Sequence, residues 1–231
     1  MKSKRKVIAL IPAAGIGARM TPEWNINNIE KEYFPKPLVK EFTTNKSLLE
    51  LVIENLRKAR IFDEIYVRVG MKSLLREDSK EPGVKREAIK KLVKFIEEKK
   101  LAKIYFNNLD EKDDGTGSTI LSEDIKEKVR EDSSIEDILI ISSDLPAIKP
   151  ETIRKIIQVH RAQKNDITLV STIEENILGH GRIVRYPVIL KGIKEKYDEL
   201  SKKSKKLNNL IKEGKMKVIR VAEGKEPYWV N

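Results

Sequence analysis

Short apolar runs alternate with longer amphipathic stretches along this chain of 231 residues. The apolar runs are rich in Ile, Val and Leu, which is typical of strands buried on both faces of a sheet. Seven such runs predict strands: residues 6–11, 64–69, 102–106, 137–142, 166–172, 183–190 and 216–221. Apolar residues at helical spacing predict helices between most of them: residues 47–60, 85–99, 118–130, 150–163 and 193–212.

Local signals mark the starts of two of these helices. Ser47 is followed three residues later by Glu50, the spacing of a capping box, and Pro150 suits the first turn of another helix. Alternating strands and helices predict an α/β fold, with a Rossmann-like, mixed but mostly parallel sheet between two helical layers. The length suits one α/β domain, so we expect residues 1–231 to form a single domain. In open sheets of this kind, ligands bind beyond the carboxyl ends of the strands.

A loop of small residues follows the first predicted strand: Ala13-Ala14-Gly15-Ile16-Gly17-Ala18-Arg19-Met20. Glycine allows backbone N–H groups to approach phosphate oxygens closely. A second cation, Lys36, follows on a turn braced by prolines, Phe34-Pro35-Lys36-Pro37-Leu38. Arg19 and Lys36 can neutralise phosphate charge that backbone dipoles alone cannot. These residues predict a cradle for a triphosphate.

The fourth predicted strand ends in a carboxylate, Asp144, followed closely by Pro146. Together with the loop, this order of motifs resembles the nucleotidyltransferases that activate sugar phosphates and related phosphorylated alcohols. Ala18 and Ser143 are small departures from that family's pattern. The resemblance implies the nucleotide-diphospho-sugar transferase fold and magnesium as the cofactor. It also implies three sets of roles: nucleotide binding by Ala13, Ala14, Gly15 and Gly17, catalysis by Arg19 and Lys36, and metal binding by Asp144.

Other interpretations of the loop fit less well. A dinucleotide-binding fingerprint requires a third glycine where this chain has Met20. A Walker-type phosphate loop requires Gly-Lys-Ser or Gly-Lys-Thr after a four-residue gap, and the sequence has none. The remaining alternative is a tight turn between a strand and a helix, made by Gly15 and Gly17 without a ligand.

A candidate base-binding segment is Asp113-Asp114-Gly115-Thr116-Gly117-Ser118. It resembles a motif of the family's N-acetylglucosamine-1-phosphate uridylyltransferase branch, the closest branch by motif, and implies nucleotide contacts by Asp113, Gly115 and Thr116. Asp113 stands where that branch has glutamine. A carboxylate accepts hydrogen bonds from uracil N3–H, but it suits the N1–H and N2–H₂ of guanine somewhat better, so the base stays open. A helix-capping turn at Gly115–Ser118 is the structural alternative.

Two further segments resemble the same branch. Gly179-His180-Gly181-Arg182-Ile183-Val184-Arg185 implies that Gly181 lies against the substrate's sugar, with His180 in place of a tyrosine. The final residues imply Asn231 as a second metal ligand, although a frayed end is the alternative. The longer segment with which that branch grips the sugar is not found between Arg185 and Lys217.

Composition narrows the possible classes of protein. The chain has no cysteine, which excludes disulfides and thiol-bound metals and fits a cytoplasmic location. No apolar stretch reaches transmembrane length, so no membrane partner is expected. The formal net charge is +11, and lysines are dense between Lys191 and Lys217. Nucleic acid is not expected as a partner, because an apolar stripe in this stretch favours an ordinary solvated helix.

The sequence therefore predicts an enzyme, a Mg²⁺-dependent nucleotidyltransferase. Its expected partners are a nucleoside triphosphate and a sugar 1-phosphate, and its expected products are a nucleoside-diphosphate sugar and pyrophosphate. A cytidylyltransferase, or a guanylyltransferase of the molybdenum-cofactor or cobinamide type, is the alternative, with a phosphorylated alcohol or cofactor precursor as acceptor. A non-catalytic module that binds nucleotide or RNA is a third hypothesis. The acceptor, the base and the oligomeric state stay open.

Overall fold

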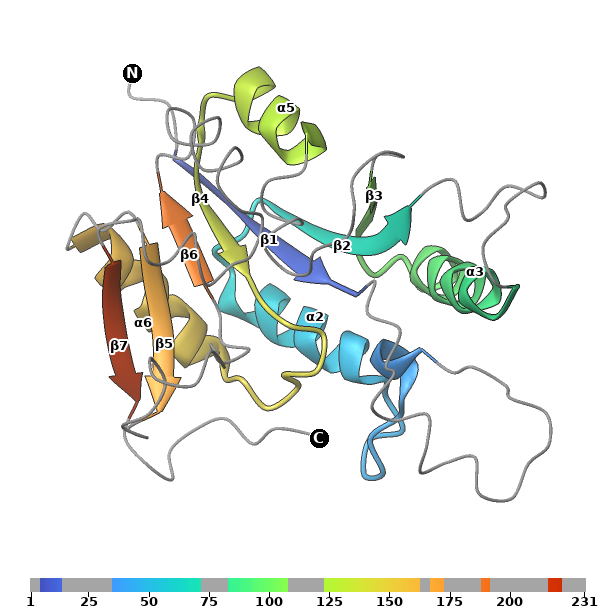
Figure 1. Ribbon diagram of the computed structural model, residues 1–231. Helices are drawn as coiled ribbons and strands as arrows, with labels where there is room; N and C mark the ends of the chain where they lie inside the picture. Colours follow the sequence, from blue (N-terminus) through green and yellow to red (C-terminus); the bar gives the residue numbers. More distant parts are fainter. Residues whose placement is uncertain are drawn as a thin grey trace, which may run out of the picture.

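A computed structural model describes residues 5–13, 35–71, 83–107, 123–162, 167–172, 188–191 and 216–221. Its centre is a seven-stranded sheet in the order β3-β2-β1-β4-β6-β5-β7 (Figure 1). The strands are β1 (Lys6–Pro12), β2 (Glu64–Met71), β3 (Lys103–Asn107), β4 (Ile135–Ile140), β5 (Ile167–Thr172), β6 (Val188–Lys191) and β7 (Met216–Val221). Part of each of the seven predicted strands is present, and the ends that the structure describes are shifted by a few residues.

The sheet is mixed and mostly parallel, as predicted. β6 pairs antiparallel with both β4 and β5, whereas every other neighbouring pair is parallel. β1 lies between β2 and β4, with Leu10 opposite Tyr66 on one side and Ile140 on the other. The carboxyl ends of β1 and β4 are therefore adjacent, although the two strands are far apart in sequence.

Helices cover both faces of the sheet. The helical elements are η1, a single 3₁₀ turn (Lys36–Leu38), α2 (Leu48–Ala59), α3 (Gly83–Glu98), α5 (Glu123–Glu131) and α6 (Pro150–Ala162). Alternate residues of β1, such as Ala9 and Ile11, share one core with apolar residues of α2, α3 and α6. α5 lies on the opposite face, where its Lys128 Nζ is 5.9 Å from the centre of the Tyr66 ring. This is the predicted three-layer arrangement.

The start of α2 follows the predicted capping box. The Ser47 hydroxyl accepts a hydrogen bond from the Glu50 backbone N–H at 3.2 Å, and the Glu50 carboxylate accepts one from the Ser47 N–H at 2.8 Å. Both bonds satisfy N–H groups that the first helical turn cannot. The predicted helix over 193–212, the strand residues 183–187 and the first residues of the segment 118–130 lie outside the described residues.

A buried polar contact joins α6 to β4. Arg161 Nε donates to Asp137 Oδ2 at 2.6 Å, and His160 Nε2 lies 3.5 Å from Asp137 Oδ1. Burial acts to raise the pKa of Asp137, but the contacts with His160 and Arg161 outweigh it and hold that pKa below its usual value. The contact therefore anchors the end of α6 on the first half of β4.

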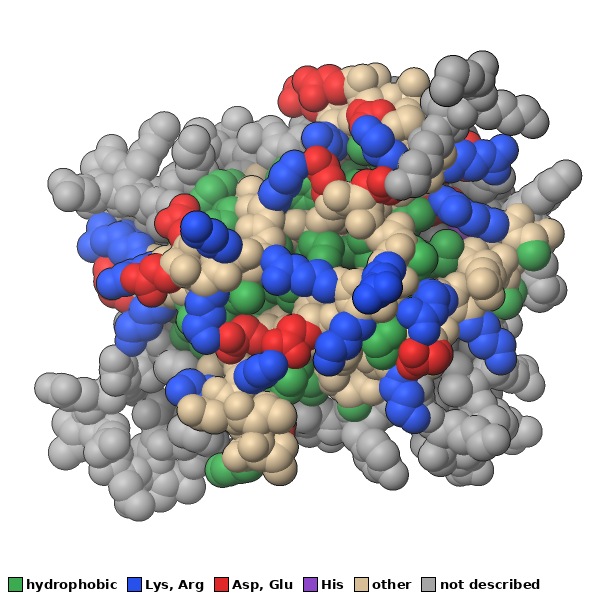
Figure 2. Space-filling view, turned by 180° about the vertical axis from the view of Figure 1, so that it is seen from behind, with side chains coloured by type: hydrophobic (Ala, Val, Ile, Leu, Met, Phe, Trp, Pro, Cys, Tyr) green, Lys and Arg blue, Asp and Glu red, His purple; other side chains and the backbone are tan. Residues whose placement is uncertain are grey.

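The described surface carries charges of both signs. Figure 2 shows Lys and Arg side chains spread over one face of the molecule, with Asp and Glu among them. Some of them form ion pairs between elements, such as Lys46 with Glu54 and Lys99 with Glu50, both at 2.5 Å. None of the helices in the described ranges combines the length and apolar character needed to cross a bilayer. The lysine-dense stretch at 191–217 lies largely outside these ranges.

Candidate active site

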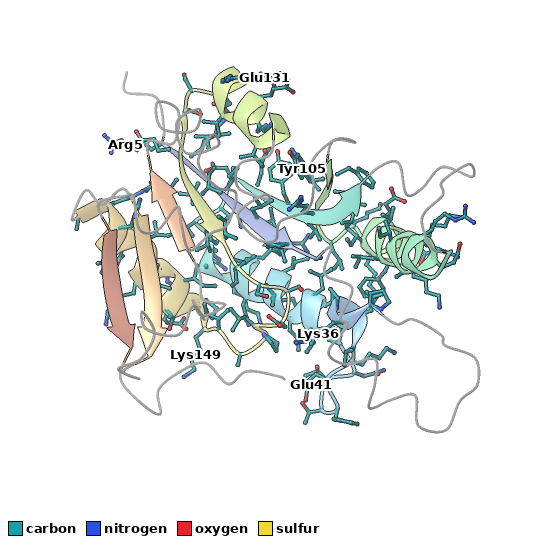
Figure 3. The ribbon with its side chains drawn as sticks, viewed as in Figure 1. Arg5, Lys36, Glu41, Tyr105, Glu131 and Lys149 are labelled. Atoms are coloured by element: carbon teal, nitrogen blue, oxygen red, sulfur yellow. The ribbon has the colours of Figure 1, made fainter. Side chains whose placement is uncertain are left out.

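Lys36 and Asp144 form an ion pair at the carboxyl edge of the sheet. They are 108 positions apart in the chain, and the Lys36 Nζ lies 2.9 Å from Asp144 Oδ2. Only 16% of the Lys36 side chain and 8% of the Asp144 side chain are exposed. In Figure 3, Lys36 lies at the end of the sheet opposite Arg5, which precedes β1. The fold therefore brings together a cation and a carboxylate that the sequence predicts for phosphate and metal.

The proline-braced turn fixes the backbone at Lys36. The Leu38 N–H donates to the Pro35 carbonyl at 2.9 Å, and the Val39 N–H donates to the Lys36 carbonyl at 3.1 Å. Pro37 and Leu38 are buried, and Leu38 belongs to the core that contains α2. Because the turn is anchored on both sides of Lys36, the backbone position from which the Lys36 side chain extends is fixed.

The loop after β4 fixes Asp144 in a similar way. The Ile141 N–H donates to the Leu10 carbonyl of β1 at 3.1 Å, which extends the pairing of the two strands. Farther along, the Asn55 side chain of α2 donates to the Pro146 carbonyl at 2.9 Å. Leu145 is fully buried between these two points. The carboxylate therefore lies on a short loop that is tied to β1 and to α2.

Both oxygens of the Asp144 carboxylate have described partners. Ser142, at the carboxyl end of β4, donates its hydroxyl to Oδ1, while Lys36 donates to Oδ2. Ser142 was not among the site residues expected from the sequence. The sequence signal that could have indicated Ser142 is its hydroxyl, two residues before the strand-end carboxylate of Asp144.

Ala13 marks the place where the small-residue loop begins. Its N–H donates to the Arg68 carbonyl of β2 at 2.8 Å, and the residue is buried. This bond continues the β1–β2 pairing by one position and fixes the direction in which the chain leaves the sheet. The Arg68 side chain is itself buried, and no role was predicted from the sequence for this arginine inside an apolar strand.

Asp144 fits a hard divalent cation such as Mg²⁺ by the chemistry of its donor atoms. Mg²⁺ prefers oxygen ligands and is commonly held by one or two carboxylates together with substrate phosphates. In the structure, Asp144 Oδ2 already faces a cation, the Lys36 ammonium. Within the described ranges, no group of three or more His, Asp or Glu side chains forms a metal cage. A metal here would therefore need ligands beyond Asp144.

The other predicted site residues lie outside the described residues and stay predictions. They are Ala14, Gly15, Gly17 and Arg19 of the loop, Asp113, Gly115 and Thr116 of the base segment, Gly181 of the sugar segment, and Asn231 as a metal ligand. Of the predicted set, the structure describes Ala13, Lys36 and Asp144. It places all three at the carboxyl edge of neighbouring strands.

Comparison by sequence finds relatives of this chain, although no protein-family model matches it. The bifunctional protein GlmU of Fervidobacterium nodosum is 29% identical over 208 residues, which cover 87% of this chain and 36% of the relative. The chain thus spans about a third of the length of the curated relatives it matches.

Solved structures share the fold. CMP:2-keto-3-deoxy-manno-octonic acid synthetase, solved with CTP, superposes with a TM-score of 0.56 at 13% identity, covering 94% of this chain and 90% of that one. The Mycobacterium tuberculosis protein Rv0371c, solved as a manganese complex, gives 0.55 at 12% identity, covering 94% and 89%. These likenesses establish the fold, and the sequence similarity to proteins named GlmU extends over most of this chain. The predicted family is therefore confirmed: the chain belongs to the nucleotidyltransferases.

Proposed function

We propose that this chain transfers a nucleoside monophosphate from a nucleoside triphosphate to a phosphorylated small molecule and releases pyrophosphate. The observation that carries the proposal is the contact of Lys36 with Asp144 beside Ala13, where the small-residue loop leaves β1. A basic group, a metal-binding carboxylate and a phosphate-binding loop are the parts that phosphoryl transfer requires, because its catalysis depends mainly on positioning and charge.

The proposed reaction is an in-line displacement. An oxygen of the acceptor phosphate forms a bond to the α-phosphorus, the bond from that phosphorus to the bridging α–β oxygen breaks, and pyrophosphate leaves with the electron pair. Lys36 would bind the α-phosphate or the incoming phosphate, and Arg19 would bind the leaving pyrophosphate. Asp144, with Asn231 as a second ligand, would hold Mg²⁺. When bound, that ion supplies charge neutralisation between the phosphates.

The preferred acceptor is a sugar 1-phosphate, giving a nucleoside-diphosphate sugar. Supporting this choice are the Gly179–Arg185 motif and the similarity in sequence to proteins named GlmU. The alternative acceptor is a phosphorylated alcohol or cofactor precursor, with CTP or GTP as donor. Asp113 in place of glutamine favours this alternative, as does the likeness in fold to a synthetase solved with CTP.

The test is pyrophosphate release in the presence of Mg²⁺ across UTP, dTTP, GTP and CTP. Each nucleotide is offered with N-acetylglucosamine 1-phosphate, with glucose 1-phosphate and without acceptor. Release that requires a sugar phosphate supports the preferred acceptor. Tight binding of GTP or CTP without sugar-dependent release supports the alternative. Steeply salt-dependent RNA binding without pyrophosphate from any acceptor would instead overturn the enzymatic proposal.

A further inference from the structure

The proposed function gives no role to Ser142, although this residue contacts Asp144. Its hydroxyl donates to Asp144 Oδ1, whereas Lys36 donates to Oδ2 of the same carboxylate. We propose that Ser142 is a positioning residue that orients Asp144, so that Oδ2 is the oxygen presented to a divalent cation. The proposal rests on the proposed function, because it requires Asp144 to be a metal ligand.

The geometry around the carboxylate supports this role. A carboxylate can rotate about its Cβ–Cγ bond, and this rotation turns its plane and redirects both oxygens. Here Ser142 holds one oxygen from the end of β4, and Lys36 holds the other from η1. With its side chain 8% exposed, Asp144 has little water available to replace either contact. The hydroxyl therefore helps to fix the plane of the carboxylate and the direction of the oxygen that faces the cation.

A second cluster shows what the same three residue types do elsewhere. In the amino-edge cluster (Lys6, Asp132, Ser134), Ser134 Oγ donates to Asp132 Oδ1, and Lys6 Nζ donates to Asp132 Oδ2 at 2.6 Å. The Ser134 backbone N–H also donates to Oδ1, at 3.0 Å, so this serine closes a local turn. The carboxyl-edge cluster (Lys36, Ser142, Asp144) joins η1 to the loop after β4 at the opposite end of the sheet, so the amino-edge cluster serves as a matched control.

Competition for Oδ2 is the measurable consequence. A divalent cation that binds this oxygen competes with the Lys36 ammonium, because two positive charges at such short range repel each other. The released ammonium is then free to bind a phosphate of the nucleotide. Lys36 thus weakens metal binding before the nucleotide arrives, while Ser142 keeps the receiving oxygen in place.

The experiment is titration of the nucleotide-free full chain with Mn²⁺, followed by electron paramagnetic resonance of the free ion. Ser142→Val removes the hydroxyl. Ser142→Thr has nearly the same shape as Ser142→Val but retains the hydroxyl. We expect Ser142→Val to weaken Mn²⁺ binding about 10-fold, the low end of the loss when a partner of a metal ligand is removed. Ser142→Thr and the control Ser134→Val should bind Mn²⁺ as the wild type does.

Lys36→Met is expected to change the Mn²⁺ affinity in the opposite direction. It removes the competing charge at similar length, so Mn²⁺ binding without nucleotide should become tighter. The inference would be overturned if the Val and Thr variants at position 142 bound Mn²⁺ with equal affinity, or if Lys36→Met bound it more weakly than the wild type. A wild-type chain that binds no Mn²⁺ without nucleotide would also overturn it. Asp144→Asn distinguishes a failure of the proposed metal site from a failure of the role proposed for Ser142. If it binds Mn²⁺ like the wild type, the proposed metal site itself is wrong. If it loses binding while the position-142 variants do not differ, only the role of Ser142 is wrong.

Discussion

The carboxyl-edge and amino-edge clusters lie at opposite ends of β1 and contain the same residue types. In each, a lysine and a serine hold the two oxygens of one aspartate. They differ in burial: the lysine and aspartate side chains are 16% and 8% exposed at the carboxyl edge, but 41% and 29% exposed at the amino edge. In Figure 3, Arg5 and Glu131, the sequence neighbours of the amino-edge residues, lie far from Lys36.

The difference shows how position in an α/β sheet gives a common side-chain contact its function. An exposed ion pair is screened by water and contributes little to stability. A shielded pair has stronger electrostatic interactions, and at the carboxyl edge it lies where open sheets bind ligands. The residue types are equivalent in the two clusters, so their surroundings must account for any difference in behaviour.

The largest expected effect separates the two lysines. Lys36→Met should lower nucleotidyl transfer about 100- to 1,000-fold, the range found when one preorganised donor to a developing charge is removed. Lys6→Met should leave the rate unchanged, because Lys6 contacts Asp132 at the other edge. Steady-state pyrophosphate release by the two variants measures this. Equal losses of activity would show that charge, rather than position, is what matters.

A second prediction tests whether burial alone confers a catalytic role. Asp137 is fully buried and contacts Arg161, but it lies within β4 rather than at the carboxyl edge. Asp137→Ala should lower the free energy of unfolding by about 1 to 3 kcal/mol, because His160 and Arg161 lose a hydrogen-bond partner while the Arg161 side chain, 36% exposed, keeps part of its hydration. Urea unfolding measures the loss. Folded Asp137→Ala protein should keep the Mn²⁺ affinity of the wild type, and a changed affinity would contradict the distinction.

A third prediction compares two serines that form hydrogen bonds near the site. Ser47 caps α2, whereas Ser142 holds a carboxylate. Ser47→Ala should lower the free energy of unfolding by about 1 kcal/mol, as expected for loss of an N-cap, without changing Mn²⁺ affinity. Thermal unfolding and the Mn²⁺ titration together check it. An affinity change in Ser47→Ala would mean that general loosening can mimic the effect expected for Ser142.

The smallest expected effect concerns pH and the amino-edge cluster. The hydrogen bond from Lys6, together with those from Ser134, lowers the pKa of Asp132 to about 2. A lowered pKa in the folded state stabilises the fold above the unfolded value of about 3.9, and this contribution is lost as the pH falls from there toward 2. The difference in stability between wild type and Asp132→Asn should shrink over that range. Urea midpoints measured at several pH values test this, and a constant difference would contradict it.

Some features were available from the sequence because they depend on neighbouring residues. Hydrophobic periodicity gave the strands and helices, and the spacing of Ser47 and Glu50 gave the capping box, since both reflect interactions within a few positions. The small-residue loop and the strand-end aspartate indicated the enzyme family for a similar reason. Each is a short motif with its own chemistry.

Other features required the tertiary structure. The contact of Lys36 with Asp144 spans 108 positions and depends on β4 pairing next to β1. The antiparallel direction of β6, the burial of Arg68 and the partner of the Ser142 hydroxyl depend on strand order in the same way. The sequence by itself predicted which groups could act on a triphosphate. Only the packing of the sheet decided which of them meet, because long-range contacts depend on how distant elements assemble and not on local pattern.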